Sequence, residues 1–354
     1  MNVKTFYCIG VMSGTSLDGV DICYVKFDVS DQYNFEILEA ETVSYSKDWL
    51  NKLKNAFTTD KSALKQVDIE YGGYLGNLIA DFMEENKIDQ LDFIASHGHT
   101  IFHKPEEGYT LQIGDGQKIA SITNQKVICD FRTQDVNLGG QGAPLVPIGD
   151  QLLFSEYDYC INFGGFANIS FKKNGERIAF DVCPVNIVMN HYMNQLGLSY
   201  DNEGELASAG EIHDALFRKL NELEFYNQSC PKSLGLEWVL ENIFPLIDDY
   251  QLEIRDILRT FVEHVAFQIS KIIKSESKIL VTGGGVFNTF LMQRIAFYSH
   301  QEIVLPYNEL IEFKEALIFA FLGLLRLQEK DNVLSSVTGA SKNHSAGVIF
   351  DSRT

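Results

Sequence analysis

Gly10-Val-Met-Ser-Gly-Thr-Ser-Leu-Asp-Gly-Val-Asp21 is the most informative stretch of this 354-residue chain. Apolar runs at 6–9 and 22–27 flank it and predict two strands joined by a small polar turn. Gly14 and Gly19 let the backbone of that turn take positive φ and approach a ligand closely. Its N–H groups, hydroxyls and carboxylates together suit a magnesium-bound polyphosphate.

The polar side chains of this turn supply two kinds of ligand group. Ser13, Thr15 and Ser16 add hydroxyl donors, and Asp18 and Asp21 provide carboxylates for a cation, held directly or through water. An ordinary hairpin turn rich in glycine, serine and aspartate is the alternative interpretation. The stretch lacks the Gly-Lys-Ser/Thr ending of a Walker A loop, and the strand-like alternation after it argues against a Rossmann fingerprint.

The composition is that of an ordinary soluble globular protein large enough for two domains. Hydrophobic residues make up 45% of the chain and charged residues 22%. The formal net charge of −19 argues against nonspecific binding to nucleic acid and against docking on anionic membranes. It leaves an anionic ligand open, because local N–H groups and a metal can hold a phosphate.

The cysteines and the N-terminus predict a cytoplasmic protein. None of the six cysteines lies in a Cys-x-x-Cys pair, and most sit in apolar strand-like runs typical of buried free thiols. The N-terminus lacks a long apolar secretory segment, and no window approaches 18 apolar residues. We therefore expect neither export nor a membrane-spanning helix.

Strands and helices alternate along the chain, which predicts an α/β fold. Strands are expected at 6–11, 21–28, 34–43, 91–96, 110–113, 126–130, 159–162, 169–171, 177–180 and 278–282. Apolar residues recur at helical spacing in 64–85 and 252–274. Further helices are expected from about 286 to 295 and from about 312 to 328.

A stretch dense in glycine and proline, 138–147, marks the predicted domain boundary. Domain I is expected to comprise 1–137 together with 338–354, and domain II to comprise 138–337. Beyond the boundary, the strand at 159–162, a polar turn containing glycine and a returning strand repeat the pattern that opens the chain. We therefore expect the two domains to share an architecture.

Two further glycine-rich turns follow apolar strands in the second half of the chain. The first contains Gly164 and Gly165, and the second contains Gly283, Gly284 and Gly285. Three such turns in one chain would build a nucleotide cleft if the two domains face each other. Tight packing where a strand meets a helix is the alternative for the second turn.

Acidic, basic and histidine side chains gather near strand ends. Asp181 ends a predicted strand and is well placed as a general base, although an aspartate that opens a turn is also common. Arg132 could clamp a carboxylate or a phosphate, with an ion pair as the alternative. His97, His99 and His103 lie close in sequence, but no matching cysteine or carboxylate set completes a zinc site, so we favour a substrate-facing loop.

These stretches together resemble the anhydro-N-acetylmuramic acid kinases, and the resemblance covers essentially the whole chain in the family's order. The stretch 10–21 is similar to the family's phosphate-binding signature. The other similar segments are Ser96-His-Gly-His-Thr100, Thr110-Leu-Gln-Ile-Gly-Asp115, Asp130-Phe-Arg132, Gly139-Gly-Gln-Gly-Ala-Pro-Leu-Val-Pro147, Asn162-Phe-Gly-Gly-Phe-Ala-Asn168, Pro231-Lys-Ser233, Gly283-Gly-Gly285, Glu315-Ala316 and Val337-Thr-Gly-Ala340.

The resemblance implies two RNase-H-like domains of the sugar kinase, Hsp70 and actin superfamily, flanking an ATP cleft. It implies a kinase that uses ATP and Mg²⁺ to hydrolyse the 1,6-anhydro ring of anhydro-N-acetylmuramic acid and to phosphorylate O6. The product, N-acetylmuramic acid 6-phosphate, would belong to cell-wall recycling. The implied partners are ATP and a small amino sugar, with a homodimer as one expected form of the protein.

The resemblance also implies roles for individual residues. Asp181 matches the base that activates water for attack at C1, and Arg132 and Glu315 match sugar-site positions near His97 and Thr100. The residues implied in ATP and phosphate binding are Gly14, Thr15, Ser16, Leu17, Asp18, Gly19, Val20, Asp21, Gly164, Gly165, Gly283, Gly284 and Gly285. Two of these, Asp18 and Asp21, are the implied Mg²⁺ ligands.

The sequence departs from the family pattern at two places. The family's Asp-Thr-Gly-Pro-Gly-Asn is here Asp181-Val-Cys-Pro-Val-Asn186, and His99 stands where glutamine is usual. Cys183 and Val185 put side chains where glycine would let the backbone approach a ligand. A kinase of the same fold for a different sugar, and a nucleotide-dependent sensor without catalysis, are the alternative functions.

Overall fold

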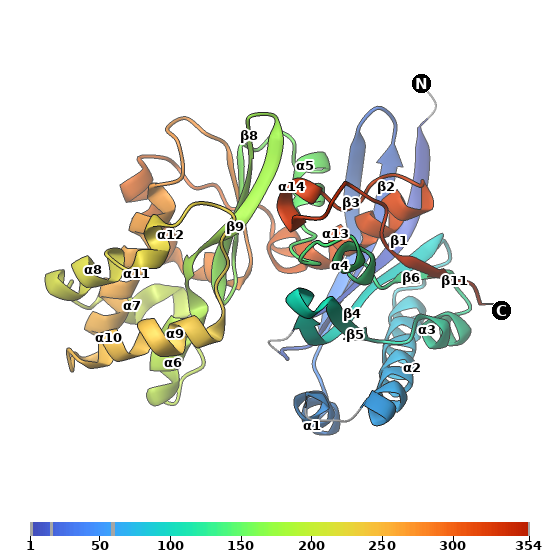
Figure 1. The fold of residues 1–354 in the computed structure, drawn as a ribbon, viewed down its shortest axis with the longest axis horizontal. Coiled ribbons are helices and arrows are strands. Elements are labelled where there is room, and N and C mark those ends of the chain that lie inside the picture. The colour runs from blue at the N-terminus through green and yellow to red at the C-terminus, as the bar shows by residue number, and fades with distance from the viewer. Residues whose placement is uncertain (1–2, 15–16, 58–60, 353–354) are drawn as a thin grey trace. The chain divides into compact units, whose positions relative to one another are not determined.

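The computed structural model describes residues 3–14, 17–57 and 61–352. Contacts between residues divide the chain into two compact units, drawn in Figure 1. Unit 1 comprises the residues up to Leu153 together with those from Phe313 onward, and unit 2 is the continuous segment Phe154–Glu312. Each unit has its own sheet and its own apolar core.

Unit 1 is built on a mixed sheet in the order β11-β6-β4-β1-β2-β3, with β5 paired to the second half of β4. Its strands are β1 (Lys4–Ser13), β2 (Val20–Val29), β3 (Tyr33–Val43), β4 (Phe93–Lys104), β5 (Tyr109–Ile113), β6 (Val127–Cys129) and β11 (Val348–Phe350). Strands β1, β2 and β3 form an antiparallel meander, while β4 runs parallel to β1 and β6 runs parallel to β4.

Helices cover both faces of this sheet. The helices and 3₁₀ turn of unit 1 are α1 (Lys47–Ala56), α2 (Lys61–Glu85), η1 (Pro105–Glu107), α3 (Gly116–Thr123), α4 (Thr133–Asn137), α5 (Pro147–Leu152), α14 (Ser335–Thr338) and most of α13 (Asn308–Leu327). Helix α2 presents the apolar stripe predicted within 64–85, and its most deeply buried residues are Tyr71, Leu75, Ile79 and Phe82.

Successive side chains of β1 point to opposite faces of the sheet, and a different helix, α2 or α13, packs on each face. Ile9 and Val11 belong to the core that contains the α2 stripe, whereas Gly10 between them lies against α13. A Cβ on Gly10 would collide with the backbone carbonyl of Ala316, so glycine is needed for α13 to lie this close to the strand. The approach positions the part of α13 that carries Glu315.

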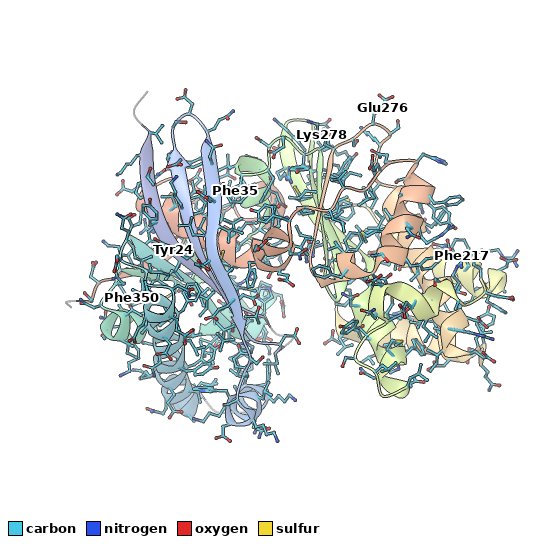
Figure 2. All side chains as sticks on the ribbon, turned by 180° about the vertical axis from the view of Figure 1, so that it is seen from behind. Tyr24, Phe35, Phe217, Glu276, Lys278 and Phe350 are labelled. Atoms are coloured by element: carbon cyan, nitrogen blue, oxygen red, sulfur yellow. The ribbon has the colours of Figure 1, made fainter. Side chains whose placement is uncertain are left out.

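Tyr24 of β2, labelled in Figure 2, belongs to the same core. Its ring stacks on Tyr7 with centroids 6.1 Å apart, and its hydroxyl donates to the carbonyl of Gln90 at 2.8 Å. The hydroxyl thereby keeps a hydrogen bond although its residue is buried.

Unit 2 repeats the strand arrangement of unit 1 on a smaller scale. Its strands are β7 (Tyr159–Phe163), β8 (Phe166–Lys173), β9 (Glu176–Pro184) and β10 (Ile279–Thr282), in the order β10-β7-β8-β9. Strands β7, β8 and β9 form an antiparallel meander, and β10 lies parallel to β7 just as β4 lies parallel to β1. The expected α/β class is confirmed, and the two units share a three-stranded meander with a parallel strand beside its first strand.

The helices of unit 2 pack on this sheet and on one another. They are α6 (Asn186–Gln195), η2 (Asn202–Gly204), α7 (Glu205–Ser208), α8 (Asp214–Asn221), η3 (Glu224–Asn227), α9 (Leu236–Asn242), α10 (Phe244–Asp248), α11 (Ile254–Ser270), η4 (Gly284–Phe287) and α12 (Thr289–Ser299). Phe217 of α8, labelled in Figure 2, meets Phe267 of α11 edge-on at 5.8 Å. Across the described ranges of both units, the helices fall short of the length and apolarity that a bilayer span demands.

The division into units differs from the predicted domain boundary. Residues 138–153 and 313–337, expected in domain II, pack with unit 1. Lys314 Nζ lies 2.7 Å from Asp150 Oδ1 in a buried ion pair, which fastens α13 to α5. The stretch rich in glycine and proline therefore makes turns within unit 1 instead of linking two domains.

Candidate functional site

The polar turn predicted to bind phosphates joins β1 to β2 in unit 1. Leu17 has a φ of 62°, and its N–H donates to the carbonyl of Gly14 at 3.3 Å. Gly19 lies so close to β3 that a Cβ would come within 2.7 Å of the Val43 carbonyl oxygen. The Gly19 end of the turn is therefore packed against β3, and Val20 begins the returning strand.

The two carboxylates of the turn have different surroundings. Asp18 is exposed, whereas Asp21 is partly buried in β2 and accepts the hydroxyl of Thr42 at 2.6 Å. Thr15 and Ser16, the predicted hydroxyl donors, lie outside the described residues.

Arg132 connects two residues predicted for the sugar site. Its Nε donates to His97 Nε2 at 2.9 Å, and its Nη1 donates to the carbonyl of Gly142 at 2.6 Å. His97 Nδ1 in turn lies 2.9 Å from the carbonyl of Gly98, so the proton of the ring resides on Nδ1. Burial and the neighbouring Arg132 charge lower the pKa of His97 well below its ordinary value, and the ring is neutral at pH 7.

Glu315 lies within the electrostatic reach of Arg132. Burial raises the pKa of Glu315, the Arg132 charge lowers it, and the charge of Asp21 raises it. Burial lowers the pKa of Arg132 to about 10 against the effect of Glu315. Four predicted residues of unit 1 (His97, Arg132, Glu315 and Asp21) are thus coupled in one cluster that can recognise hydroxyls and an anion.

The structure places 97–100 within β4 and not in the predicted loop. Gly98 has a φ of 70°, and the register between β1 and β4 shifts here, which marks a bulge. His97 consequently lies 4.7 Å from Phe319 of α13, whereas His99 faces Tyr71 of α2. The two imidazoles therefore lie on opposite faces of the sheet.

Replacing Gly98 with alanine is expected to destabilise unit 1 by about 1–3 kcal/mol. Alanine is strained at this φ, and its Cβ would also collide with the carbonyl oxygen of Ile113 on β5. Urea unfolding followed by Trp49 fluorescence in a Trp238→Phe background measures the loss in unit 1. Gly108→Ala, at φ 69° with open space around it, is the control that carries strain alone. Equal losses in both variants would contradict the packing argument.

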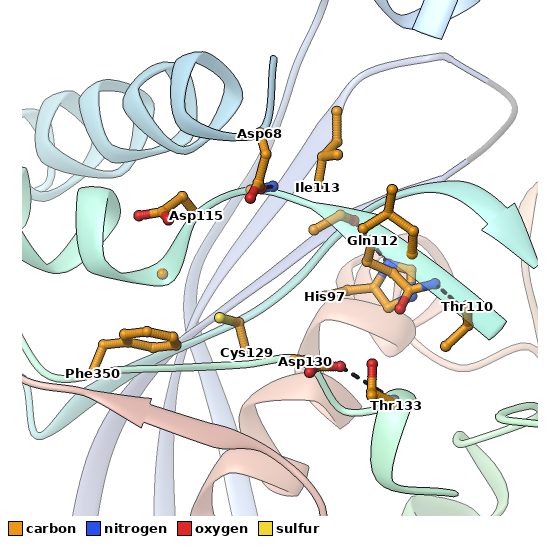
Figure 3. Close-up of a pocket in the computed structure, with 14 residues that line it drawn as sticks. Asp68, His97, Thr110, Gln112, Ile113, Asp115, Cys129, Asp130, Thr133 and Phe350 are labelled. Atoms are coloured by element: carbon orange, nitrogen blue, oxygen red, sulfur yellow. Dashed lines mark hydrogen bonds between the residues drawn. The ribbon is translucent and has the colours of Figure 1, made fainter. Parts of the chain in front are cut away.

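A cavity of about 200 Å³ adjoins the cluster in unit 1 (Figure 3). Three aspartates line it and each accepts one backbone N–H, namely Asp68, Asp115 and Asp130. Gln112 also lines the cavity and donates to the hydroxyl of Thr100 at 3.4 Å, while its buried Oε1 has no hydrogen-bond partner among the described residues. This lining offers acceptor oxygens to the hydroxyl or amide donors of a ligand.

Asp181 is held in β9 of unit 2 by the segment 230–234. Its N–H donates to the carbonyl of Lys232 at 3.1 Å, and its Oδ2 accepts the N–H of Leu234 at 2.8 Å. Lys232 is itself anchored, because its Nζ donates to the carbonyl of Phe225 at 3.0 Å. Burial raises the pKa of Asp181, although the Leu234 N–H lowers it. A carboxylate fixed through one oxygen, with a raised pKa, has the character of a general base.

The side chains that depart from the family pattern after Asp181 lie in the core of unit 2. Val182, Cys183 and Val185 are all buried among its apolar residues. Strand β9 continues to Pro184, beyond the end predicted at 180. The side chains of Val182, Cys183 and Val185 therefore fill the interior of unit 2.

The two glycine turns of unit 2 follow the adjacent parallel strands β7 and β10. Cβ atoms on Gly283 and Gly285 would come within 2.8 Å of Phe163 atoms, which is the close packing that the alternative stated above expects. Gly284 has open space where a Cβ would stand. The carbonyls of 164–165 accept the first N–H groups of α6.

Asp135 has a supporting role that the sequence did not predict. It is fully buried, and its carboxylate accepts the N–H of Gly142 at 2.6 Å and the hydroxyl of Thr338 at 2.7 Å. It thereby ties the turn that holds Arg132 to the C-terminal segment. The signal in the sequence is an acidic residue three positions before a glycine-rich stretch.

Comparisons with known proteins agree with this assembly of motifs. A family model described as anhydro-N-acetylmuramic acid kinase matches residues 6–352. The chain is 34% identical over 371 residues to an anhydro-N-acetylmuramic acid kinase of Vibrio vulnificus (strain CMCP6), with 99% of each chain covered. It is 34% identical over 374 residues to a protein of the same name from Pasteurella multocida, covering 99% of this chain and 98% of that one. A protein of the same name from Sulfurimonas denitrificans is 32% identical over 382 residues, covering 99% and 100%.

Proposed function

Because this chain belongs to the anhydro-N-acetylmuramic acid kinase family, we propose that it couples hydrolysis of the 1,6-anhydro bond of anhydro-N-acetylmuramic acid to phosphorylation of O6. Water adds to C1, the C1–O6 bond breaks, and O6 takes the γ-phosphoryl group of ATP while ADP leaves. The product is N-acetylmuramic acid 6-phosphate, a step of cell-wall recycling in the cytoplasm, with ATP and the amino sugar as small-molecule partners.

The observation that carries this proposal is the fixed and partly buried carboxylate of Asp181. Oδ2 accepts the N–H of Leu234, which orients the carboxylate and leaves Oδ1 to take a proton from the attacking water. Water attack at an anomeric carbon needs one such base, as in glycoside hydrolysis. After the step the proton passes from Asp181 to solvent, so the base is regenerated.

The cluster of Arg132, His97 and Glu315 is proposed to recognise the sugar. The guanidinium of Arg132 is held through Nε and Nη1, and its remaining donors can bind the carboxylate of the muramic acid lactyl group. Glu315 offers oxygens to sugar hydroxyls, and Thr100 and the cavity beside His97 extend the same surface. A rigid, planar cation suits a carboxylate better than a flexible lysine would.

The turn 14–21 is proposed to hold the ATP phosphates, with the glycine turns of unit 2 on the adenosine side. Asp18 and Asp21 fit a Mg²⁺ ion, because one or two carboxylates commonly hold this metal together with phosphates and water. When bound, the metal would neutralise charge on the transferred phosphoryl group. The open space at Gly284 is where backbone can meet a nucleotide.

Incubation with ATP, Mg²⁺ and anhydro-N-acetylmuramic acid in H₂¹⁸O tests the proposal. We expect ADP release that requires the sugar, and a product that carries both a phosphate and one ¹⁸O atom at C1, seen by mass spectrometry. ADP release with another anhydro-sugar alone would replace the substrate but keep the reaction class. Nucleotide binding without turnover of any sugar would overturn the kinase assignment.

The pH profile of kcat/KM is expected to fall on the acid side at a pH above the ordinary aspartate pKa of 3.8. Asp181 must be deprotonated to accept a proton, and burial raises its pKa, so activity disappears as the pH decreases through the raised value. Initial rates measured with subsaturating sugar at a series of acid pH values locate the pH at which kcat/KM falls. If kcat/KM instead falls at the ordinary aspartate pKa, the titrating group is a different carboxyl group that is exposed to solvent.

A further inference from the structure

Four polar side chains form a hydrogen-bonded chain at the base of the β1–β2 turn. Ser13 Oγ lies 2.7 Å from the Tyr71 hydroxyl and 3.1 Å from His99 Nδ1, and the Tyr71 hydroxyl lies 2.8 Å from that of Tyr45. Tyr71 and His99 are 0% exposed, Ser13 is 1% exposed and Tyr45 is 8% exposed. Because water does not reach these groups, each bond is strong and each broken bond leaves a polar atom unpaired.

The hydrogen-bonded side chains connect β1, the strand before the turn, to the end of β3. The start of β2, on the other side of the turn, pairs with β3. Ser13 is the last residue of β1. Tyr45 follows the end of β3, where Val43 pairs with Val20 at the start of β2 and where Gly19 packs. The hydrogen bonds therefore connect the end of β1, directly before Gly14, to the segment after β3, close to the residues against which Gly19 packs.

Every member of the chain is uncharged at neutral pH. Burial raises the pKa of Tyr71 and of Tyr45, and burial lowers the pKa of His99 to about 4. A neutral imidazole and three hydroxyls can each donate or accept, so these hydrogen bonds form without placing a charge in the core. The other ring nitrogen, His99 Nε2, is buried and has no hydrogen-bond partner among the described residues. His99 reaches this face because of the bulge at Gly98.

We propose that Ser13, Tyr71 and His99 are positioning residues, which hold Gly14 and Gly19, the described ends of the phosphate-binding turn, in place for binding the ATP phosphates. The inference rests on the proposed function only in taking that turn as the phosphate-binding site. Donors that are already in place bind a ligand without first losing conformational entropy. Breaking the chain therefore weakens nucleotide binding and raises KM for ATP, while KM for the sugar stays unchanged.

Calorimetric titration with Mg²⁺ and a nonhydrolysable ATP analogue, without sugar, measures this effect. We expect Tyr71→Phe and Ser13→Ala to weaken binding by about fivefold to tenfold, the equivalent of one intramolecular hydrogen bond. Tyr24→Phe is the matched control, because it removes a hydrogen bond of similar length, 2.8 Å, that a tyrosine hydroxyl of β2 makes in the same unit. The control is expected to keep the nucleotide Kd of the unmodified chain.

Substitutions of His99 separate positioning from general packing. Asparagine places an amide group near the position of Nδ1, so His99→Asn is expected to retain most of the nucleotide affinity. Leucine fills similar space without a polar atom, so His99→Leu is expected to lose about as much affinity as Ser13→Ala. Thermal unfolding of each variant records any loss of stability separately from binding.

The outcomes distinguish this inference from the proposed function. Nucleotide binding by the unmodified chain, with Tyr71→Phe, Ser13→Ala and His99→Leu no weaker than Tyr24→Phe, would overturn the positioning role alone. Failure of the unmodified chain to bind the nucleotide would overturn the proposed function and this inference with it. Loss of affinity in these variants, with partial retention in His99→Asn, supports the positioning role.

Discussion

Replacing Asp181 with asparagine is expected to lower kcat by about a hundredfold to ten-thousandfold while the nucleotide still binds. The asparagine Oδ1 can accept the Leu234 N–H that Asp181 Oδ2 accepts, so the side chain keeps its position but cannot take a proton. Single-turnover ADP formation measures the loss, and titration with a nonhydrolysable ATP analogue shows that the site remains intact. A kcat within tenfold of the unmodified enzyme would remove Asp181 from the mechanism.

The same substitution has an expected effect on stability that controls for misfolding. Burial raises the pKa of Asp181, so ionisation disfavours the folded state, and stability falls as the pH rises from 3.8 through the raised value. At neutral pH the asparagine variant should therefore be at least as stable as the unmodified chain. Asp248→Asn, which alters a carboxylate that accepts the Tyr192 hydroxyl elsewhere in unit 2, is expected to leave kcat unchanged.

Replacing Lys314 with methionine is expected to destabilise unit 1 by about 3–5 kcal/mol. Lys314 and Asp150 are both buried with 2.7 Å between Nζ and Oδ1, so the variant leaves a carboxylate in the interior without its cation. Methionine retains most of the length and volume of the lysine stem, so little packing is lost. Urea unfolding followed by Trp49 in a Trp238→Phe background measures the change in unit 1.

Two comparison variants test whether removal of the buried lysine charge causes this loss. The double variant Lys314→Met with Asp150→Leu is expected to recover most of the stability, because both buried charges are then absent. Lys52→Met breaks the solvent-exposed pair with Glu70 and is expected to cost less than about 1 kcal/mol. Similar losses in Lys314→Met and Lys52→Met would contradict the argument from burial.

Local periodicity predicted most of the secondary structure correctly. The helix expected at 64–85 is α2, Lys61–Glu85, and the strand expected at 34–43 is β3, Tyr33–Val43. The sequence also predicts that each half begins with a strand, a glycine-containing turn and a returning strand, and both units contain such a pair. These features depend on residues close in the chain, so their pattern of burial is visible without a structure.

Features created by contacts between distant residues were not predictable in this way. The ion pair of Asp150 and Lys314 connects α5 to α13, and α5 and most of α13 belong to unit 1. No local pattern near either residue in the sequence predicts this ion pair. The strand β4 runs through the expected loop because β5 pairs with its second half. The domain boundary and this loop were therefore placed wrongly by a reading of composition alone.

The candidate site was predictable where residue type carries the chemistry. Arg132 and His97 were singled out from the sequence, and they are in contact in the structure. The support of Asp181 was missed because the N–H of Leu234 supplies it, and a backbone group leaves no signature in residue type. The hydroxyls of Tyr71 and Tyr45 were missed because buried tyrosines read as ordinary core.

Unit 1 is formed by two segments of the chain with unit 2 between them, and this order has a consequence for folding during translation. The sheet of unit 1 begins within the first residues made, but α13, which covers one of its faces, and β11, which lies at its edge, emerge only after unit 2 is complete. On the ribosome, the continuous unit 2 can therefore fold while the earlier half of unit 1 still exposes the apolar surface around Phe93 and Ala95. Translation that stops before Phe313 omits most of α13, so we expect chains truncated there to leave this surface uncovered and to aggregate.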